Sequence, residues 1–206
     1  MTKNFMNLYK KNGTCYIEQQ NVPFTDEELG SLEKMCQDVP KEFVEVGDAG
    51  ELNHLSVGRF QTDVEKPKIV NQKFSNVVMP ILENEKIMSF IKEVLDTRKK
   101  LFIRRVQFNE IEKNCFIGYH LDIDSNPDYL AACVIQFGSD YKGGLYRVFK
   151  PENNNKFIDY KCARYSLIVS NCLYPHEVTK VLEGSRKSLV FFVSDHFKEN
   201  RRLSAN

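Results

Sequence analysis

The sequence predicts an α+β fold in which helices from the first half of the chain pack on one face of a jelly-roll barrel formed by the second half. In the first 100 residues, apolar side chains recur at helical spacing. From Leu101 onward they occur in short runs typical of strands, separated by turn signals such as Gly143-Gly144. Helices followed by strands favour an α+β arrangement, and eight short strands suit a jelly-roll barrel.

A capping box predicts where the first helix begins. The segment Thr25-Asp26-Glu27-Glu28 places a threonine three residues before a glutamate, so that each side chain can bond the backbone amide of the other. We expect this helix to run to about Gln37, before Pro40. The following segment, 41–60, should be irregular or strand-like.

Two more helices are expected before the barrel. Apolar residues fall at helical spacing over 70–81 and again over 87–95. Pro80 and the pair Glu83-Asn84 should separate the two helices, because a proline interrupts the main-chain hydrogen bonds of a helix.

The strands of the barrel are predicted from the apolar runs of the second half. They should lie at 101–110, 115–123, 130–137, 145–149, 156–160, 165–170, 177–182 and 187–194. A small-ligand site is expected inside such a barrel. The polar residues 197–206 should be frayed.

Length and composition predict one domain, with helical support over 1–100, a barrel core over 101–196 and a tail over 197–206. A formal charge of +1 gives no field that would attract nucleic acid or an anionic membrane. We expect no membrane span, because no apolar run approaches about 20 residues, and no signal peptide. Six cysteines without a Cys-x-x-Cys pair predict reduced thiols in a cytoplasmic protein.

The segment His120-Leu121-Asp122 and the later His176 predict a metal site. Residues two apart on an extended strand project from the same face, so His120 and Asp122 can hold one ion together. His176, from a returning strand, would be the third ligand. Two imidazoles and one carboxylate suit iron(II) with open coordination positions better than calcium or magnesium. Zinc accepts the same set, so the ligands alone leave the metal open.

Arg186 and Ser188 predict a carboxylate-binding site beside this metal. Arg186 follows His176 by ten residues and Ser188 follows Arg186 by two, so strand alternation puts both side chains on one face. A guanidinium offers two parallel donors to a carboxylate and a hydroxyl adds a third. Because simple zinc hydrolysis needs no such clamp, the pattern favours iron(II) with the dicarboxylate 2-oxoglutarate.

These motifs resemble a known family. The stretch from Val106 to Val193 is similar to the double-stranded β-helix core of the 2-oxoglutarate- and Fe(II)-dependent oxygenases, above all the prolyl-hydroxylase-like branch. The matching residues are His120-Leu121-Asp122, the hairpin 142–149 around Gly143-Gly144, Pro175-His176-Glu177-Val178, and Arg186. The resemblance implies Fe(II), 2-oxoglutarate and O2 as cofactors. It also implies that the co-substrate is oxidised to succinate while a C–H bond is hydroxylated.

Two positions depart from the hypoxia-sensing relatives. A tyrosine that helps to bind the co-substrate there is matched by Gln136, whose amide can still donate a hydrogen bond. The relatives also have a second tyrosine before the iron motif, and in this sequence its place lies near Asn109, where no tyrosine occurs. We expect both residues to border the co-substrate. Asp122 stands where related halogenases have a small residue, which argues for hydroxylation or desaturation.

Basic residues near the barrel are less decisive. Arg104 and Arg105 begin the core, and one of them is a candidate for meeting an anionic substrate group. Arg59 is a candidate of the same kind. For all three, an ion-paired or structural arginine is the simpler interpretation.

The predicted function is hydroxylation of an unactivated C–H bond in a free amino acid or other small metabolite. The alternative is a hydroxylase of prolyl or other residues in a protein, so the expected partner is a small-molecule or peptidyl substrate. Two further alternatives stay open: a non-catalytic metal-binding sensor barrel and a zinc isomerase or hydrolase. Nucleic acid is not expected as a substrate, because no basic stripe is evident.

Overall fold

The computed structural model of the chain describes residues 2–201. Helices occupy mainly the first half, at α1 (Thr2–Asn12), η1 (Gln19–Asn21), α2 (Asp26–Asp38), α3 (Gln72–Leu82), α4 (Glu85–Val94) and the short α5 (Asp122–Ser125). Strands in the first half are β1 (Thr14–Ile17), β2 (Lys41–Val46), β3 (Leu52–Asp63) and β4 (Pro67–Ile69).

The second half is mostly strand. It contains β5 (Phe102–Ile111), β6 (Phe116–His120), β7 (Ala131–Gln136), β8 (Tyr141–Gly143), β9 (Tyr146–Lys150), β10 (Asn153–Tyr160), β11 (Leu167–Asn171), β12 (His176–Val178), β13 (Val181–Gly184) and β14 (Arg186–Ser194).

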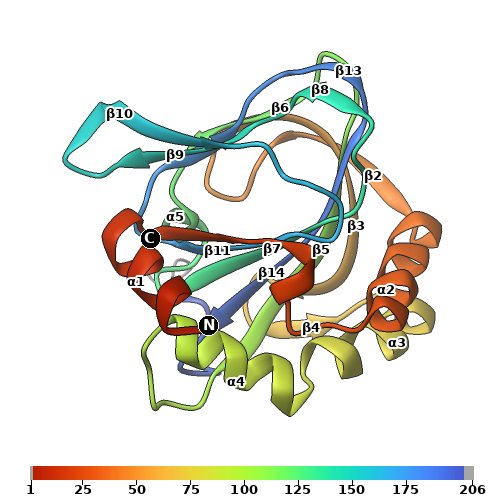
Figure 1. Cartoon of the computed structure of the whole chain (residues 1–206). Coiled ribbons are helices and arrows are strands. Elements are labelled where there is room, and N and C mark those ends of the chain that lie inside the picture. Colours follow the sequence, from red (N-terminus) through yellow and green to blue (C-terminus); the bar gives the residue numbers. More distant parts are fainter. Residues whose placement is uncertain (1, 202–206) are drawn as a thin grey trace.

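Two antiparallel sheets share strand β3 and curl into a nearly closed barrel (Figure 1). The larger sheet follows the order β1-β11-β7-β14-β5-β3 within the described residues, and β2 and β4 also pair with β3. The smaller sheet continues from β3 through β6-β12-β9-β10. Because β3 pairs with β5 along one part and with β6 at Asn53 and His54, it forms the corner that joins the sheets. The predicted jelly-roll, double-stranded β-helix fold is confirmed.

The larger sheet has two differently used faces. On β14, Leu189, Phe191 and Val193 belong to the buried cluster that includes the helices. The alternate residues Val190 and Phe192 belong to the cluster inside the barrel. Strand alternation therefore lets one sheet carry a helix-covered core outside and a ligand-sized interior inside. In Figure 1 the helices α3 and α4 lie on the side of the molecule opposite β9 and β10.

The helix predicted from the capping box is confirmed as α2. The Thr25 hydroxyl accepts a bond from the Glu28 amide at 3.1 Å, and the Thr25 amide donates to the Glu28 carboxylate at 2.8 Å. The two further helices are α3 and α4, but only Glu83 and Asn84 separate them. α3 continues through Pro80, because a proline in the last turn removes just one main-chain bond.

Three details of the predicted element pattern were wrong. The segment 41–60 is strand-like, as expected, but it forms β2 and most of β3, and β3 belongs to the barrel, whereas all the predicted barrel strands lie after residue 100. The strand expected at 177–182 is divided between β12 and β13, which belong to different sheets. The residues 197–201 are not frayed: Asn200 is buried and its amide donates to the carbonyls of Asp63 and Ser125. The rest of the expected tail, 202–206, lies outside the described residues.

Candidate active site

Two histidines from distant parts of the chain face each other across paired strands. His120 ends β6 and His176 begins β12, and the antiparallel register places them directly opposite one another. Their ring centroids are 4.3 Å apart. Because directly opposed residues project to the same side of a sheet, both imidazoles enter the barrel interior.

Asp122 joins the two histidines. The strand predicted over 115–123 ends at His120. Leu121 is still extended, and Asp122 begins the helical turn α5. The Asp122 carboxylate lies 3.4 Å from Nε2 of His120 and 3.6 Å from Nε2 of His176. One potential ligand atom from each of the three residues lies within 4.8 Å of the others.

The hydrogen bonds of the two imidazoles fix which nitrogen is available. His120 Nδ1 lies 2.8 Å from the carbonyl oxygen of Gly118, and His176 Nδ1 lies 3.1 Å from that of Tyr174. A carbonyl oxygen only accepts, so Nδ1 carries the proton in each ring. Nε2 of each ring is therefore the nitrogen left to bind a metal, which is the usual arrangement of metal-binding histidines.

The charge distribution of this cluster matches a cation site. Burial alone would lower the pKa of His120, but the adjacent Asp122 carboxylate outweighs it and raises the pKa to about 9. Burial lowers the pKa of His176. Burial opposes ionisation of Asp122, yet the two histidines hold its pKa below the ordinary value. Asp122 Oδ2 is buried and accepts no hydrogen bond, so one carboxylate oxygen is left for another partner.

Arg186 and Ser188 lie in the same cavity as the His-Asp-His cluster. Both are buried on β14, and the guanidinium donates to the Ser188 hydroxyl at 3.3 Å. In the described part of the chain no carboxylate lies within ion-pair distance of Arg186, and its Nε has no hydrogen-bond partner. A buried guanidinium without an anion is costly, so the site is suited to an added carboxylate.

Asn109 and Gln136 flank Ser188 across neighbouring strands. Ser188 is registered opposite Asn109 of β5 and opposite Gln136 of β7, so the three side chains form one row. Asn109 lines the cavity. Gln136 is buried at the end of the row and donates to the Gly138 carbonyl at 3.0 Å, while its own side-chain oxygen has no partner.

Tyr146 is a cavity residue that the sequence reasoning missed. Its ring centroid lies 5.3 Å from that of His176, and its buried hydroxyl has no hydrogen-bond partner of ordinary geometry. Tyr146 lies two residues before Val148, which is registered opposite His176, so both side chains lie on the cavity face of β9, but this register is not visible in the sequence. The hairpin 142–149 was noted for its resemblance alone.

The three arginines considered from the sequence have different places. Arg104 is fully buried and binds the Asp63 carboxylate through two hydrogen bonds of 2.9 Å, a structural role. Arg105 lines the cavity, and so does Arg59, which also pairs with Glu42 at 2.7 Å.

Comparison with solved structures identifies the family. An oxidoreductase of the 2OG-Fe(II) oxygenase family from Burkholderia pseudomallei is 32% identical, with a TM-score of 0.90 over 98% of this chain and 94% of that one. The chain belongs to the 2OG-Fe(II) oxygenase family. It is therefore an oxygenase that uses Fe(II), 2-oxoglutarate and O2, as the sequence predicted. No family model and no curated protein matches it.

Two solved structures of much lower sequence identity share the fold. A prolyl hydroxylase from Trichoplax adhaerens, in complex with a hypoxia-inducible-factor peptide fragment, has a TM-score of 0.70 at 12% identity, over 100% of this chain and 92% of that one. The epimerase SnoN, in complex with Fe3+, alpha-ketoglutarate and nogalamycin RO, has a TM-score of 0.67 at 8% identity, over 94% of this chain and 83% of that one. At these identities the similarity concerns the fold alone.

None of the described helices is long and apolar enough to cross a membrane.

Proposed function

We propose that His120, Asp122 and His176 hold the iron and that Arg186 and Ser188 bind the distal carboxylate of 2-oxoglutarate. One observation carries this assignment. Asp122 Oδ2 and Arg186 Nε are buried polar atoms without partners, and both residues line one cavity. A metal would satisfy the first and a carboxylate the second, so a single iron-bound dicarboxylate would account for both.

The donor set fits iron(II). One nitrogen from each imidazole and one carboxylate oxygen lie within 4.8 Å of one another beside the cavity, and both imidazoles would be neutral once they hold the metal. When bound, the metal and co-substrate supply the oxidising chemistry, in which O2 converts 2-oxoglutarate to succinate and carbon dioxide and the second oxygen atom is inserted into a C–H bond.

The protein contributes position and exclusion of water. The backbone carbonyls of Gly118 and Tyr174 hold the imidazoles in one tautomer and one orientation. Apolar side chains of Ile117, Val134 and Val178 line the cavity around the cluster. They shield the site from water and strengthen the electrostatic contacts of Arg186.

Three polar residues would complete the co-substrate site. Asn109 and Gln136 lie on either side of Ser188, which follows Arg186 by two residues on β14. The Tyr146 hydroxyl is buried beside His176 and would donate to the co-substrate near the metal. Tyr146 reaches the site from β9, so it would supply the phenol hydroxyl that is absent at Gln136.

For the primary substrate we propose a free amino acid or another small metabolite, which is hydroxylated. The turn between β2 and β3 contributes to the lining of the cavity, which carries side chains of both charge signs, including Glu51 and Arg105. Such a lining suits a small charged molecule. The alternative, a residue in a protein, is favoured by the fold shared with the peptide-bound prolyl hydroxylase. The sensor and zinc-enzyme alternatives do not fit a member of the 2OG-Fe(II) oxygenase family.

A spectroscopic titration tests the proposed residues. The anaerobic iron(II) protein should develop the weak visible band of a chelated keto acid when 2-oxoglutarate is added. We expect His176→Ala to lose the band and Arg186→Lys to need at least tenfold more 2-oxoglutarate, because a lysine cannot make two parallel bonds. An unchanged band in His176→Ala would contradict the ligand assignment.

A further inference from the structure

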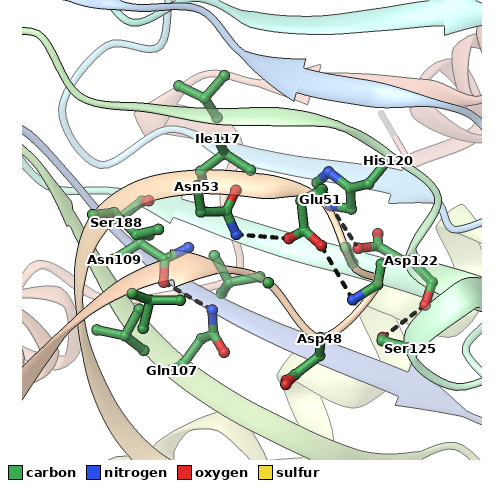
Figure 2. A pocket seen from close by; sticks show the side chains of 18 of the residues that line it. Asp48, Glu51, Asn53, Gln107, Asn109, Ile117, His120, Asp122, Ser125 and Ser188 are labelled. Carbon is green, nitrogen blue, oxygen red and sulfur yellow. Dashed lines mark hydrogen bonds and ion pairs between the residues drawn. The ribbon is translucent and has the colours of Figure 1, made fainter.

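Glu51 is a carboxylate inside the cavity that no basic side chain neutralises. It lies at the tip of the β2–β3 hairpin and lines the same cavity as His120 and Asp122. Figure 2 shows it between Asn53 and the pair of His120 and Asp122. Among the described residues, no lysine, arginine or histidine nitrogen lies within ion-pair distance of its carboxylate.

The hairpin turn holds this carboxylate in place. One oxygen accepts a hydrogen bond from the Asn53 side-chain amide at 2.7 Å, and the other accepts from the Ala49 backbone amide at 3.1 Å. Asn53 is itself fixed, because its oxygen accepts from the Gly118 amide at 3.2 Å. A Cβ atom at Gly47 would lie 1.7 Å from a Glu51 oxygen, so the glycine leaves the room that the carboxylate occupies.

The loaded site would make Glu51 selective for a cation. The charge of iron(II) is cancelled by doubly negative 2-oxoglutarate, and Arg186 offsets one of the two remaining carboxylates, Asp122 and Glu51. One negative charge is left over near the metal. In a partly dehydrated cavity this excess favours a positively charged group on the molecule that binds next.

Arg105, on β5, lines the same cavity and offers the opposite charge. Its guanidinium donates from Nε to the Gln107 oxygen at 2.8 Å, and Gln107 donates to the Asn109 oxygen at 2.8 Å. Its Nη2 lies 2.5 Å from the Asp48 carboxylate. The Arg105 side chain is 12% exposed, whereas that of Asp48 is 46% exposed. Asp48 is therefore the more solvent-screened partner of the pair, and a carboxylate that enters the cavity would compete with it for Arg105.

We propose that the cavity binds a free amino acid as a zwitterion, with its ammonium group at Glu51 and its carboxylate at Arg105 in place of Asp48. This inference rests on the proposed function, because it assumes that iron and 2-oxoglutarate occupy the inner part of the cavity. It also separates the two substrate classes, since a residue within a protein has neither an α-ammonium nor an α-carboxylate group.

Ligand binding without turnover tests the inference. The protein would be loaded with redox-inert zinc(II) and 2-oxoglutarate, and a pool of the common L-amino acids would be screened by saturation-transfer NMR. The amino acid that binds would then be compared by calorimetry with its N-acetyl and carboxamide derivatives. We expect each derivative to bind at least about tenfold more weakly, the loss expected for one charge-assisted hydrogen bond.

Two variants assign the two charges. Glu51→Gln should lower the affinity for the parent amino acid about tenfold. It should abolish the preference for the parent over the N-acetyl derivative and leave the preference over the carboxamide. Arg105→Gln should abolish the preference for the parent over the carboxamide and leave the preference over the N-acetyl derivative. Glu45→Gln, which removes a carboxylate from an exposed position of the same hairpin, should change neither preference. Glu51→Asp, with the charge retained, should keep part of the first preference.

The outcomes separate the zwitterion inference from the proposed oxygenase site. If the protein binds 2-oxoglutarate but no amino acid, or binds the derivatives as tightly as the parent, the zwitterion inference is overturned and the proposed oxygenase site stands. If 2-oxoglutarate itself does not bind, the proposed site is overturned and the inference falls with it. A thermal melt of each variant shows whether it is folded.

Discussion

At the scale of single residues, the site depends on side chains whose hydrogen-bonding capacity the protein leaves unused. Asp122 Oδ2 and Arg186 Nε are buried and have no hydrogen-bond partner. Burial of polar atoms without partners costs free energy, so these residues are poorly explained by stability alone. Their positions in one cavity are what the proposed iron and 2-oxoglutarate site requires.

Removing the carboxylate should remove catalysis. Asp122→Gly leaves two imidazoles to hold the metal, so we expect hydroxylation to be abolished and iron affinity to fall at least tenfold. Product formation and iron retention after gel filtration are the two measurements. Normal turnover by this variant would rule out the proposed ligand role of Asp122.

The guanidinium should act mainly on the co-substrate. Arg186→Lys keeps the charge but loses the bidentate geometry, so we expect the KM for 2-oxoglutarate to rise by about 10- to 100-fold, the cost of one or two charge-assisted bonds. Steady-state succinate release at varied 2-oxoglutarate checks this. A KM within twofold of the unaltered protein would show that Arg186 does not meet the co-substrate.

Single residues also show how far the sequence could be interpreted. His120, Asp122, His176 and Arg186 carry a spacing that predicts their convergence, and the structure brings them together. Tyr146, Glu51 and Arg105 have no comparable spacing. Their entry into the cavity depends on strand register and on a hairpin turn, which are set by pairing between distant segments.

At the scale of elements, the C-terminal segment is tied to the loop before β7. The carboxylate of Asp128 is nearly fully buried, bonds Arg201, and lies 3.0 Å from Nε2 of His196. Burial alone would raise the pKa of Asp128, but Arg201 and His196 outweigh it and lower the pKa. The ionised carboxylate therefore stabilises the folded protein.

This contact should give a defined dependence of stability on pH. Because the folded pKa of Asp128 is lowered, its contribution should be complete above the unfolded value of about 3.9 and lost as the pH falls through the folded value. We expect Asp128→Asn to lower the free energy of unfolding by about 1 kcal/mol at pH 7 and by less in acid. The effect at pH 7 is modest because Arg201 is largely exposed.

Thermal melts from pH 7 downward measure this difference. Glu199→Gln is the matched control, because it removes an exposed carboxylate paired with Lys66 from the same segment and should shift the melting temperature little. A difference between Asp128→Asn and the unaltered protein that grows as the pH falls would contradict the assignment.

Elements also explain the sequence-based errors. The apolar run at 177–182 contains a break at Thr179 and Lys180, where the chain leaves β12 and enters β13 in another sheet. A run of alternating residues cannot reveal which sheet each half joins. The segment 197–201 is polar, yet Asn200 is buried because two backbone carbonyls accept its amide hydrogens. Composition does not indicate such pairing.

At the scale of the whole molecule, the larger sheet separates stability from chemistry. Leu189 faces the helices and its neighbour Ser188 faces the cavity, so one strand serves both purposes. The fold class could be predicted because both patterns, helical and strand-like, are strong in the sequence. How the first half contributes β3 to the barrel could not, since that pairing joins residues far apart in the chain.

A substitution on the outer face should therefore affect stability alone. Leu189→Ala should lower the free energy of unfolding by about 2–5 kcal/mol through lost burial and the cavity that remains. Affinity for 2-oxoglutarate in the folded fraction should stay within twofold, because the side chain points away from the site. Denaturant unfolding and calorimetry at low temperature measure the two effects. A tenfold loss of 2-oxoglutarate affinity would show that the faces are not independent.

The central claim concerns the iron and 2-oxoglutarate site, and succinate release tests it most directly. The anaerobically iron-loaded protein would be exposed to air with 2-oxoglutarate and either pooled amino acids or a proline-containing peptide library, beside His176→Ala. We predict iron-dependent succinate formation that amino acids stimulate and that the variant loses. Succinate formation that persists at the same rate in His176→Ala would contradict the claim.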